Sequence, residues 1–68
     1  MEIIAKRIRE IRKENNLSQL EFGKLLCVSQ DNVSLWENGK SCPSVQHIII
    51  ISKTFNVSSD YLLGLSDY

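Results

Sequence analysis

The sequence predicts a single all-α domain, and three observations support this. The chain has 68 residues, which is enough for one hydrophobic core, so residues 1–68 are expected to form one domain. The composition, 43% hydrophobic and 24% charged with 3 Gly and 1 Pro, is typical of an ordered globular protein. Apolar residues recur at helical spacing between helix-capping residues. Five short helices without strands are therefore expected.

The first helix is expected over residues 2–15. Ile4, Ile8 and Ile11 follow one another at steps of four and three, which places them on one face. The dipeptide Asn15-Asn16 then breaks the pattern.

The second helix is expected from about Ser18 to Leu26. Ser18 and Glu21 match a capping box, in which the hydroxyl and the carboxylate each satisfy a free backbone N–H at the helix start. Phe22 and Leu26 form its apolar stripe.

Serine residues also open the remaining helices. Ser29 can cap a third helix that carries Val33 and Trp36 inward and ends at Asn38-Gly39. The fourth helix follows Pro43-Ser44 and runs through Val45, Ile48, Ile51, Ser52 and Phe55, and the fifth follows Ser58 and carries Tyr61, Leu62 and Leu63 before Gly64.

The charged residues are unevenly distributed although the formal net charge is zero. Five of the eight bases lie in the first thirteen residues, at Lys6, Arg7, Arg9, Arg12 and Lys13. Glu2, Glu10 and Glu14 offset much of this charge, so a solvated helix face with pairs at helical spacing is the preferred interpretation. Charge alone does not indicate a nucleic-acid surface.

Several classes of function are disfavoured by composition. The longest apolar runs, residues 25–28 and 48–51, are far shorter than the ~20 residues of a membrane helix, and no signal peptide opens the chain, so a cytoplasmic protein is expected. Cys27, Cys42 and His47 lack a fourth ligand for zinc, and the cysteines are interpreted as free thiols packed as small apolar groups. No metal, cofactor, small-molecule ligand or catalytic constellation is expected.

The second and third helices are separated only by Cys27, Val28 and Ser29, a link typical of a helix-turn-helix. Residues 17–40 read LSQLEFGKLLCVSQDNVSLWENGK, followed by PS from 43 and NVSSDYLLG from 56. With these motifs, the chain resembles the phage repressor and Cro family, or XRE type, over about residues 4–64, with the helix-turn-helix at about 19–38. The resemblance implies a compact lambda-repressor-like fold and a transcriptional regulator, a repressor in our interpretation, that binds double-stranded DNA sequence-specifically.

Two small residues shape the expected turn. Gly23 lies where the second helix approaches the next one closely, so a larger side chain would hold the two apart. In the family the position of Cys27 is usually glycine, and a non-glycine residue is disfavoured at positive φ. A locally strained or slightly altered turn is therefore expected.

The resemblance places the third helix in the major groove, with the second crossing the DNA backbone. The expected base-reading residues are Gln30, Asp31, Asn32, Ser34 and Leu35. The Gln30 amide can donate to and accept from adenine. Asp31 could accept from cytosine or simply favour the helix N-terminus through the dipole, and Leu35 could contact a thymine methyl or be merely exposed.

Phosphate contacts are expected from Ser18, Gln19, Ser29, Asn38 and Lys40, together with the loop backbone. Gln19 resembles a family glutamine that contacts a phosphate and supports the first base reader, although a solvated polar residue is the alternative. Arg12 and Glu37 resemble a largely buried ion pair between the first helix and the end of the third, and Trp36 resembles a core aromatic.

A homodimer on an inverted repeat is also implied. In the family, the contacts come from the region of the fifth helix, here Ser59, Leu62 and Leu65, and Ile50 is added to this expected interface. Ile50 stands where relatives often have lysine, and a lone exposed isoleucine is the alternative interpretation.

Two alternatives stay open at this stage. A protein-interaction module, such as an antitoxin or antirepressor-like partner, could keep the fold without strong DNA binding, and the zero net charge and Asp31 favour it. The end of the chain at residues 64–68 is compatible with a complete small repressor or with a domain followed by a linker.

Overall fold

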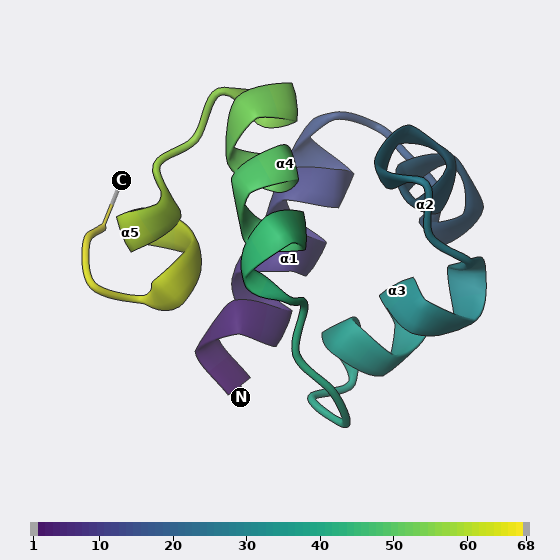
Figure 1. Cartoon of the computed structure of the whole chain (residues 1–68), viewed down its shortest axis with the longest axis horizontal. Helices are drawn as coiled ribbons and strands as arrows, with labels where there is room; N and C mark the ends of the chain where they lie inside the picture. The colour runs from purple at the N-terminus through teal and green to yellow at the C-terminus, as the bar shows by residue number, and fades with distance from the viewer. Residues whose placement is uncertain (1, 68) are drawn as a thin grey trace.

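The computed structural model describes residues 2–67, which form five helices and no strand (Figure 1). The helices are α1 (Glu2–Glu14), α2 (Gln19–Leu26), α3 (Gln30–Glu37), α4 (Val45–Phe55) and α5 (Ser59–Leu63). The predicted all-α class is confirmed, and α1 ends one residue before the expected boundary. None of these five helices is long and apolar enough to cross a membrane.

Serine hydroxyls start four of the helices. Ser18, Ser29, Ser44 and Ser58 each accept a hydrogen bond from the backbone N–H three residues later, which satisfies a donor that the first helical turn leaves free. The predicted capping box at Ser18 is confirmed, because the Ser18 N–H also donates to Glu21 at 2.9 Å. This backbone hydrogen bond is the main reason that the pKa of Glu21 is lowered.

The core lies around α1, which runs behind α4 with α5 on one side and α2 and α3 on the other (Figure 1). Its buried members come from all five helices: Ile4, Ile8, Ile11, Phe22, Leu26, Val33, Trp36, Ile48, Ile51 and Leu62. The expected inward stripe of α1 and the core position of Trp36 are confirmed. The rings of Phe22 and Phe55 stack with centroids 5.3 Å apart, which ties α2 to α4.

Some charged side chains of α1 contact α5 and do not face only solvent. The Tyr61 hydroxyl donates to the Glu10 carboxylate at 3.0 Å, and the Arg7 guanidinium lies 4.1 Å from the centre of the Tyr61 ring. The solvated-face interpretation was therefore incomplete, because three polar side chains join α1 to α5.

The two cysteines differ from the expectation. Neither Cys27 nor Cys42 forms a disulfide, but both are exposed rather than packed. Cys27 occupies the turn after α2, and in the loop before α4 the buried position is taken by Pro43. Within residues 2–67 no three His, Cys, Asp or Glu side chains gather as a metal site, and His47 instead lies beside Ser44 and Trp36.

Gly23 and Cys27 set the spacing of α2 and α3. A Cβ atom on Gly23 would lie 2.6 Å from the Val28 carbonyl oxygen. The sequence had suggested a close approach to the next helix, but the close approach is to the backbone of the turn. Cys27 adopts φ 59° and ψ 38°, the left-handed conformation that favours glycine. Of the two expected outcomes, a strained turn or a slightly altered one, the turn therefore shows the strained conformation.

Candidate nucleic-acid interface

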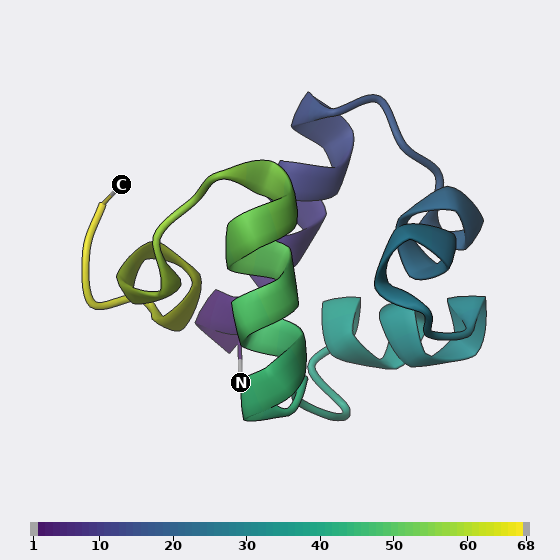
Figure 2. The same ribbon diagram turned by 45° about the horizontal axis from the view of Figure 1, so that its top comes forward.

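The α2–α3 pair forms a helix-turn-helix (Figure 2), and α3 has one buried and one exposed side. Val33 and Trp36 bury the inner side of α3. The tight turn at Cys27 leads directly into the first turn of α3, so the turn and the buried side of α3 together fix its orientation.

The predicted base-reading residues lie together on α3, with different degrees of exposure. Gln30, Asp31 and Asn32 are exposed in the first turn. Leu35 is 39% exposed, whereas Ser34 is half-buried and its hydroxyl accepts from the Asn38 amide at 3.3 Å. The freest polar groups of the helix are therefore those at its N-terminal end.

The predicted phosphate-contacting residues differ in how far their side chains are already engaged within the protein. The hydroxyls of Ser18 and Ser29 already accept the capping hydrogen bonds described above, and Asn38 donates to Ser34. Lys40 is exposed. Gln19 is half-buried and directs its amide nitrogen at the Glu37 carboxylate, 3.3 Å away and at the far end of α3 from Gln30.

The loop backbone after α3 is not free to bind phosphate as expected. The N–H groups of Asn38, Gly39 and Lys40 donate to carbonyls of Ser34, Trp36 and Leu35, at 3.0–3.2 Å. These bonds satisfy the last carbonyls of the helix. Contact between this loop and a phosphate would therefore depend on side chains.

Glu37 is the centre of a polar cluster that joins α1, α2 and α3. Arg12 donates to both carboxylate oxygens, at 2.6 and 3.0 Å, and its third nitrogen donates to the Leu17 carbonyl. The side chains of Glu37 and Arg12 are only 2% and 14% exposed. The two residues thus form a largely buried, two-bonded ion pair.

The pKa of Glu37 reflects opposing influences. Burial is the largest and acts to raise the pKa, but hydrogen bonds from Arg12 and Gln19 and the charges of Arg12 and Arg9 together lower it below the usual value of 4.5. The hydrogen bond with Glu37 is also the main reason that the pKa of Arg12 is raised. The carboxylate is therefore ionised at neutral pH.

Arg9 is a member of this cluster that the sequence analysis did not assign. Its Nη2 donates to the Glu37 backbone carbonyl at 3.0 Å, and its Nε lies 3.7 Å from the Glu37 carboxylate. Arg9 precedes Arg12 by three residues on α1, so helical spacing could have placed it on the same side. That spacing alone does not reveal a contact with α3.

The expected dimer residues include one that is wrongly assigned. Leu62 is completely buried in the core, so it cannot contact a second copy. The neighbouring Leu63 is exposed instead, as are Ile50, Ser59 and Leu65. A five-residue helix packed on α1 presents adjacent residues to opposite environments, and the DYLL sequence does not show which leucine is covered.

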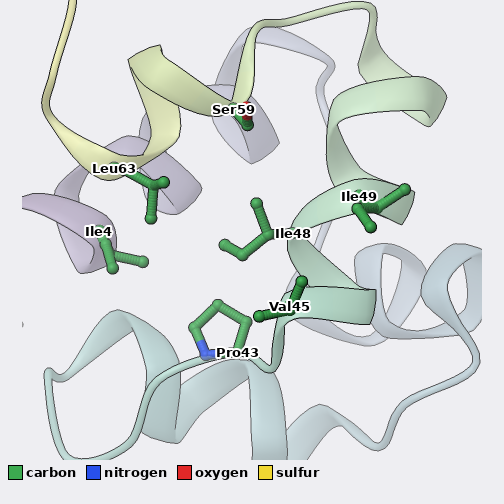
Figure 3. Close-up of a pocket in the computed structure, with 7 residues that line it drawn as sticks. All are labelled: Ile4, Pro43, Val45, Ile48, Ile49, Ser59 and Leu63. Atoms are coloured by element: carbon green, nitrogen blue, oxygen red, sulfur yellow. The ribbon is translucent and has the colours of Figure 1, made fainter.

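An apolar groove lies next to Leu63, between the start of α1, the start of α4 and α5. It has a volume of about 300 Å³, and its lining residues are Ile4, Pro43, Val45, Ile48, Ile49, Ser59 and Leu63. Figure 3 shows these side chains arranged around the hollow. Six of these seven lining residues are apolar, and Leu63 is one of them.

Comparison with known proteins identifies the family. A family model described as helix-turn-helix matches residues 8–62, and the chain belongs to this family, in its XRE or phage-repressor type. The crystal structure of the P22 c2 repressor in complex with a synthetic operator superimposes with a TM-score of 0.86 at 32% identity, covering 97% of this chain and 100% of that one. The predicted family and its repressor-like fold are thus confirmed.

Two curated relatives show how much of a longer protein is matched. Antitoxin PezA of Streptococcus pneumoniae is 40% identical over 62 residues, which are 91% of this chain and 39% of the relative. Repressor protein C2 of Salmonella phage P22 is 34% identical over 62 residues, which are 91% of this chain and 29% of the relative. The chain therefore spans less than half the length of either relative.

Proposed function

We propose that this chain is a sequence-specific DNA-binding transcriptional regulator, with residues 1–68 acting as one binding unit. The observation that supports this most directly is the exposed polar first turn of α3, held on a helix-turn-helix whose other side is buried. In proteins of this architecture, the N-terminal residues of the second helix of the motif, here α3, contact base edges in the major groove. A repressor role is supported by the similarity to P22 c2.

The proposed base contacts follow from the chemistry of the exposed residues. Gln30 offers an amide that can pair with adenine, and Asn32 offers a second amide two positions later in the same turn. Leu35 is suited to a thymine methyl group. Asp31 can accept from cytosine, but its position in the first turn also favours α3 through the helix dipole.

The direct test is selection of bound sequences from a random DNA duplex pool, followed by titration of the selected sequence and an unrelated duplex. We expect a common half-site sequence and tighter binding to the selected duplex by a factor of about 10³ or more. Equal binding to both duplexes, or no binding to either, would contradict the proposal.

We also propose that two copies bind an inverted repeat through the face that carries the groove. Leu63, Val45 and Ile49 offer adjoining apolar surface there, and a twofold axis would bring the same surface of both copies together. Paired copies combine base contacts that are few in one domain. Exposed Ile50 and Leu65 would border this contact, and Ser59 lines the groove itself.

An alternative proposal is a protein-interaction module, and the match to antitoxin PezA supports it. Such a module would keep the fold, but its affinity for DNA would be no higher than its affinity for an unrelated acidic polymer. The titration above separates the two proposals. We further propose a cytoplasmic location, because the protein has to be in the compartment that contains the DNA. We also propose a role without catalysis or cofactor, because binding to DNA requires neither.

A further inference from the structure

The helix-turn-helix of this chain is short of positive charge. Residues 17–40 contain only Lys24 and Lys40 as bases, against Glu21, Asp31 and Glu37. Affinity for DNA depends strongly on how many phosphates a protein neutralises, because each contact releases condensed counterions. If this chain binds DNA as proposed, part of the positive charge has to come from another element.

Arg9 on α1 is placed to supply that charge. Its side chain is 47% exposed, in contrast to 14% for Arg12. The contact between its Nη2 and the Glu37 carbonyl fixes the guanidinium beside the C-terminal end of α3, where the loop to Lys40 begins. A guanidinium has five N–H donors, so this anchor leaves donors on its exposed side for an outside acceptor.

The charge of Arg9 is in excess within its cluster. The Glu37 carboxylate is bound at 2.6 and 3.0 Å by Arg12, whereas the Nε of Arg9 is 3.7 Å from it. One carboxylate therefore faces two guanidinium groups, and the more exposed of the two is Arg9. This contrasts with an ordinary surface ion pair, in which the charges cancel.

The rest of α1 strengthens this positive surface. Lys6 and Lys13 lie three residues before and four residues after Arg9, which places all three on one exposed face of the helix. The carboxylate of Glu10 is occupied on the α5 side by the Tyr61 hydroxyl. Lys6, Arg9 and Lys13 therefore form a basic stripe on α1, with Glu2 at its N-terminal end, whereas Arg7 lies against the Tyr61 ring on the α5 side.

We propose that Arg9 is a DNA-backbone contact, which binds a phosphate beside the C-terminal end of α3 while Gln30 reads bases at the other end. This inference rests on the proposed DNA-binding function. Because α3 holds the guanidinium before DNA arrives, less side-chain freedom is lost on binding. A phosphate contact of this kind carries no sequence information.

The test is the salt dependence of binding for Arg9→Gln, with Lys53→Gln as the matched control that removes one charge from α4. Each protein is titrated with the selected operator and with an unrelated duplex over a salt series. Arg9→Gln should reduce the log–log slope by about 0.9, so its affinity deficit should shrink by about threefold to fourfold between 50 and 200 mM salt on both duplexes. Arg9→Lys should keep the wild-type slope, because it keeps the charge.

Thermal melting separates this role from a purely structural one. Because Arg9 is half exposed, Arg9→Gln should remain folded, and its melting curve checks this. An unchanged slope with a lowered melting temperature would show that Arg9 only caps α3 and would overturn the inference. An equal fall in slope for Lys53→Gln would also overturn it, whereas a wild type that binds no DNA would overturn the proposed function itself.

Discussion

Gln30 is the first residue of α3 and has an exposed side chain, which makes its role in base recognition separable from folding. We expect Gln30→Ala to weaken binding to the selected operator by about 1–3 kcal/mol and to relax the preference at one base position. Gln46→Ala, which removes an exposed glutamine from α4, is the matched control and should bind as the wild type does. Competition titrations with single-base variants of the operator measure both effects.

The loss on random DNA decides how that result is interpreted. If Gln30→Ala binds specific and unrelated duplexes more weakly by the same factor, then Gln30 contacts only the backbone. Its assignment as a base reader would then be wrong, although the proposed function would stand.

Glu37, in contrast to Gln30, is buried in an ion pair, so its role is inseparable from folding. Glu37→Ala would leave the Arg12 guanidinium without its carboxylate in a site only 14% exposed. We expect a loss of about 3–5 kcal/mol in the free energy of unfolding, a large part of what so small a domain has. Glu14→Ala, which removes an exposed carboxylate from α1, should change it by less than about 0.5 kcal/mol. A Glu37→Ala domain as stable in urea as the wild type would disprove this role.

The lowered pKa of Glu37 predicts a pH dependence of stability. Because the folded-state pKa lies below the usual 4.5, the stabilising contribution is fully present above about pH 4.5 and is lost as the pH falls through the folded-state value. Glu37→Gln has no such proton to bind. The difference in unfolding free energy between wild type and Glu37→Gln should therefore narrow on acidification, and urea unfolding at a series of pH values measures it. A difference that stays constant to about pH 3 would contradict this.

At the same scale, resemblance and spacing differed in what they could predict. The pairing of Arg12 with Glu37 was expected because the family motif includes both positions. The contacts of Arg9 and Gln19 with Glu37 were not expected, because they depend on how α1 and α2 approach the end of α3. No local pattern specifies that approach.

At the scale of the element, helix starts were predictable to within a residue. A serine whose hydroxyl accepts from the third following N–H is a local arrangement, and Ser18, Ser29 and Ser58 form it as expected. Ser44, which was expected only to open the fourth helix together with Pro43, forms it too. The expectation for the cysteines failed because burial is not local. Cys27 is exposed at a left-handed turn even though cysteine is usually buried.

The turn at Cys27 leads to a stability prediction for the helix-turn-helix. A non-glycine residue in the left-handed region costs about 1–2 kcal/mol, and glycine removes this cost but adds freedom to the unfolded chain. We expect Cys27→Gly to stabilise the domain by about 0.5–1 kcal/mol, since the exposed thiol contributes little packing. Cys27→Val should destabilise it, because a β-branched residue fits this conformation poorly. Equal melting temperatures for the two variants would show that the turn is not strained.

At the scale of the whole molecule, the proposed dimer predicts a difference between Leu63 and an exposed residue away from the groove. Leu63→Glu would place a charge beside the groove at the proposed twofold contact, with the core intact. We expect it to weaken binding to a full palindrome by about tenfold or more while leaving half-site binding unchanged. The two recognition helices of the dimer should lie about 34 Å apart, one turn of DNA.

Thr54→Glu is the control for this experiment, because Thr54 is an exposed residue of α4 outside the groove and outside the helix-turn-helix. Sedimentation with and without the palindrome measures the stoichiometry directly. One protein per palindrome, or the same affinity for Leu63→Glu and wild type, would exclude this dimer. Leu62→Glu is unsuitable as a test because Leu62 lies in the core.

The sequence by itself determined which residues form helices, where serines cap them and which family the chain resembles, because periodicity and capping are local and the motifs have fixed spacing. Only the tertiary structure decided that Leu62 rather than Leu63 is buried, that Arg9 is anchored to the end of α3 and that Gln19 turns toward Glu37. The physical reason is that burial and these contacts depend on segments far apart in the chain. The spacing of residues along one helix does not indicate which other helix covers those residues.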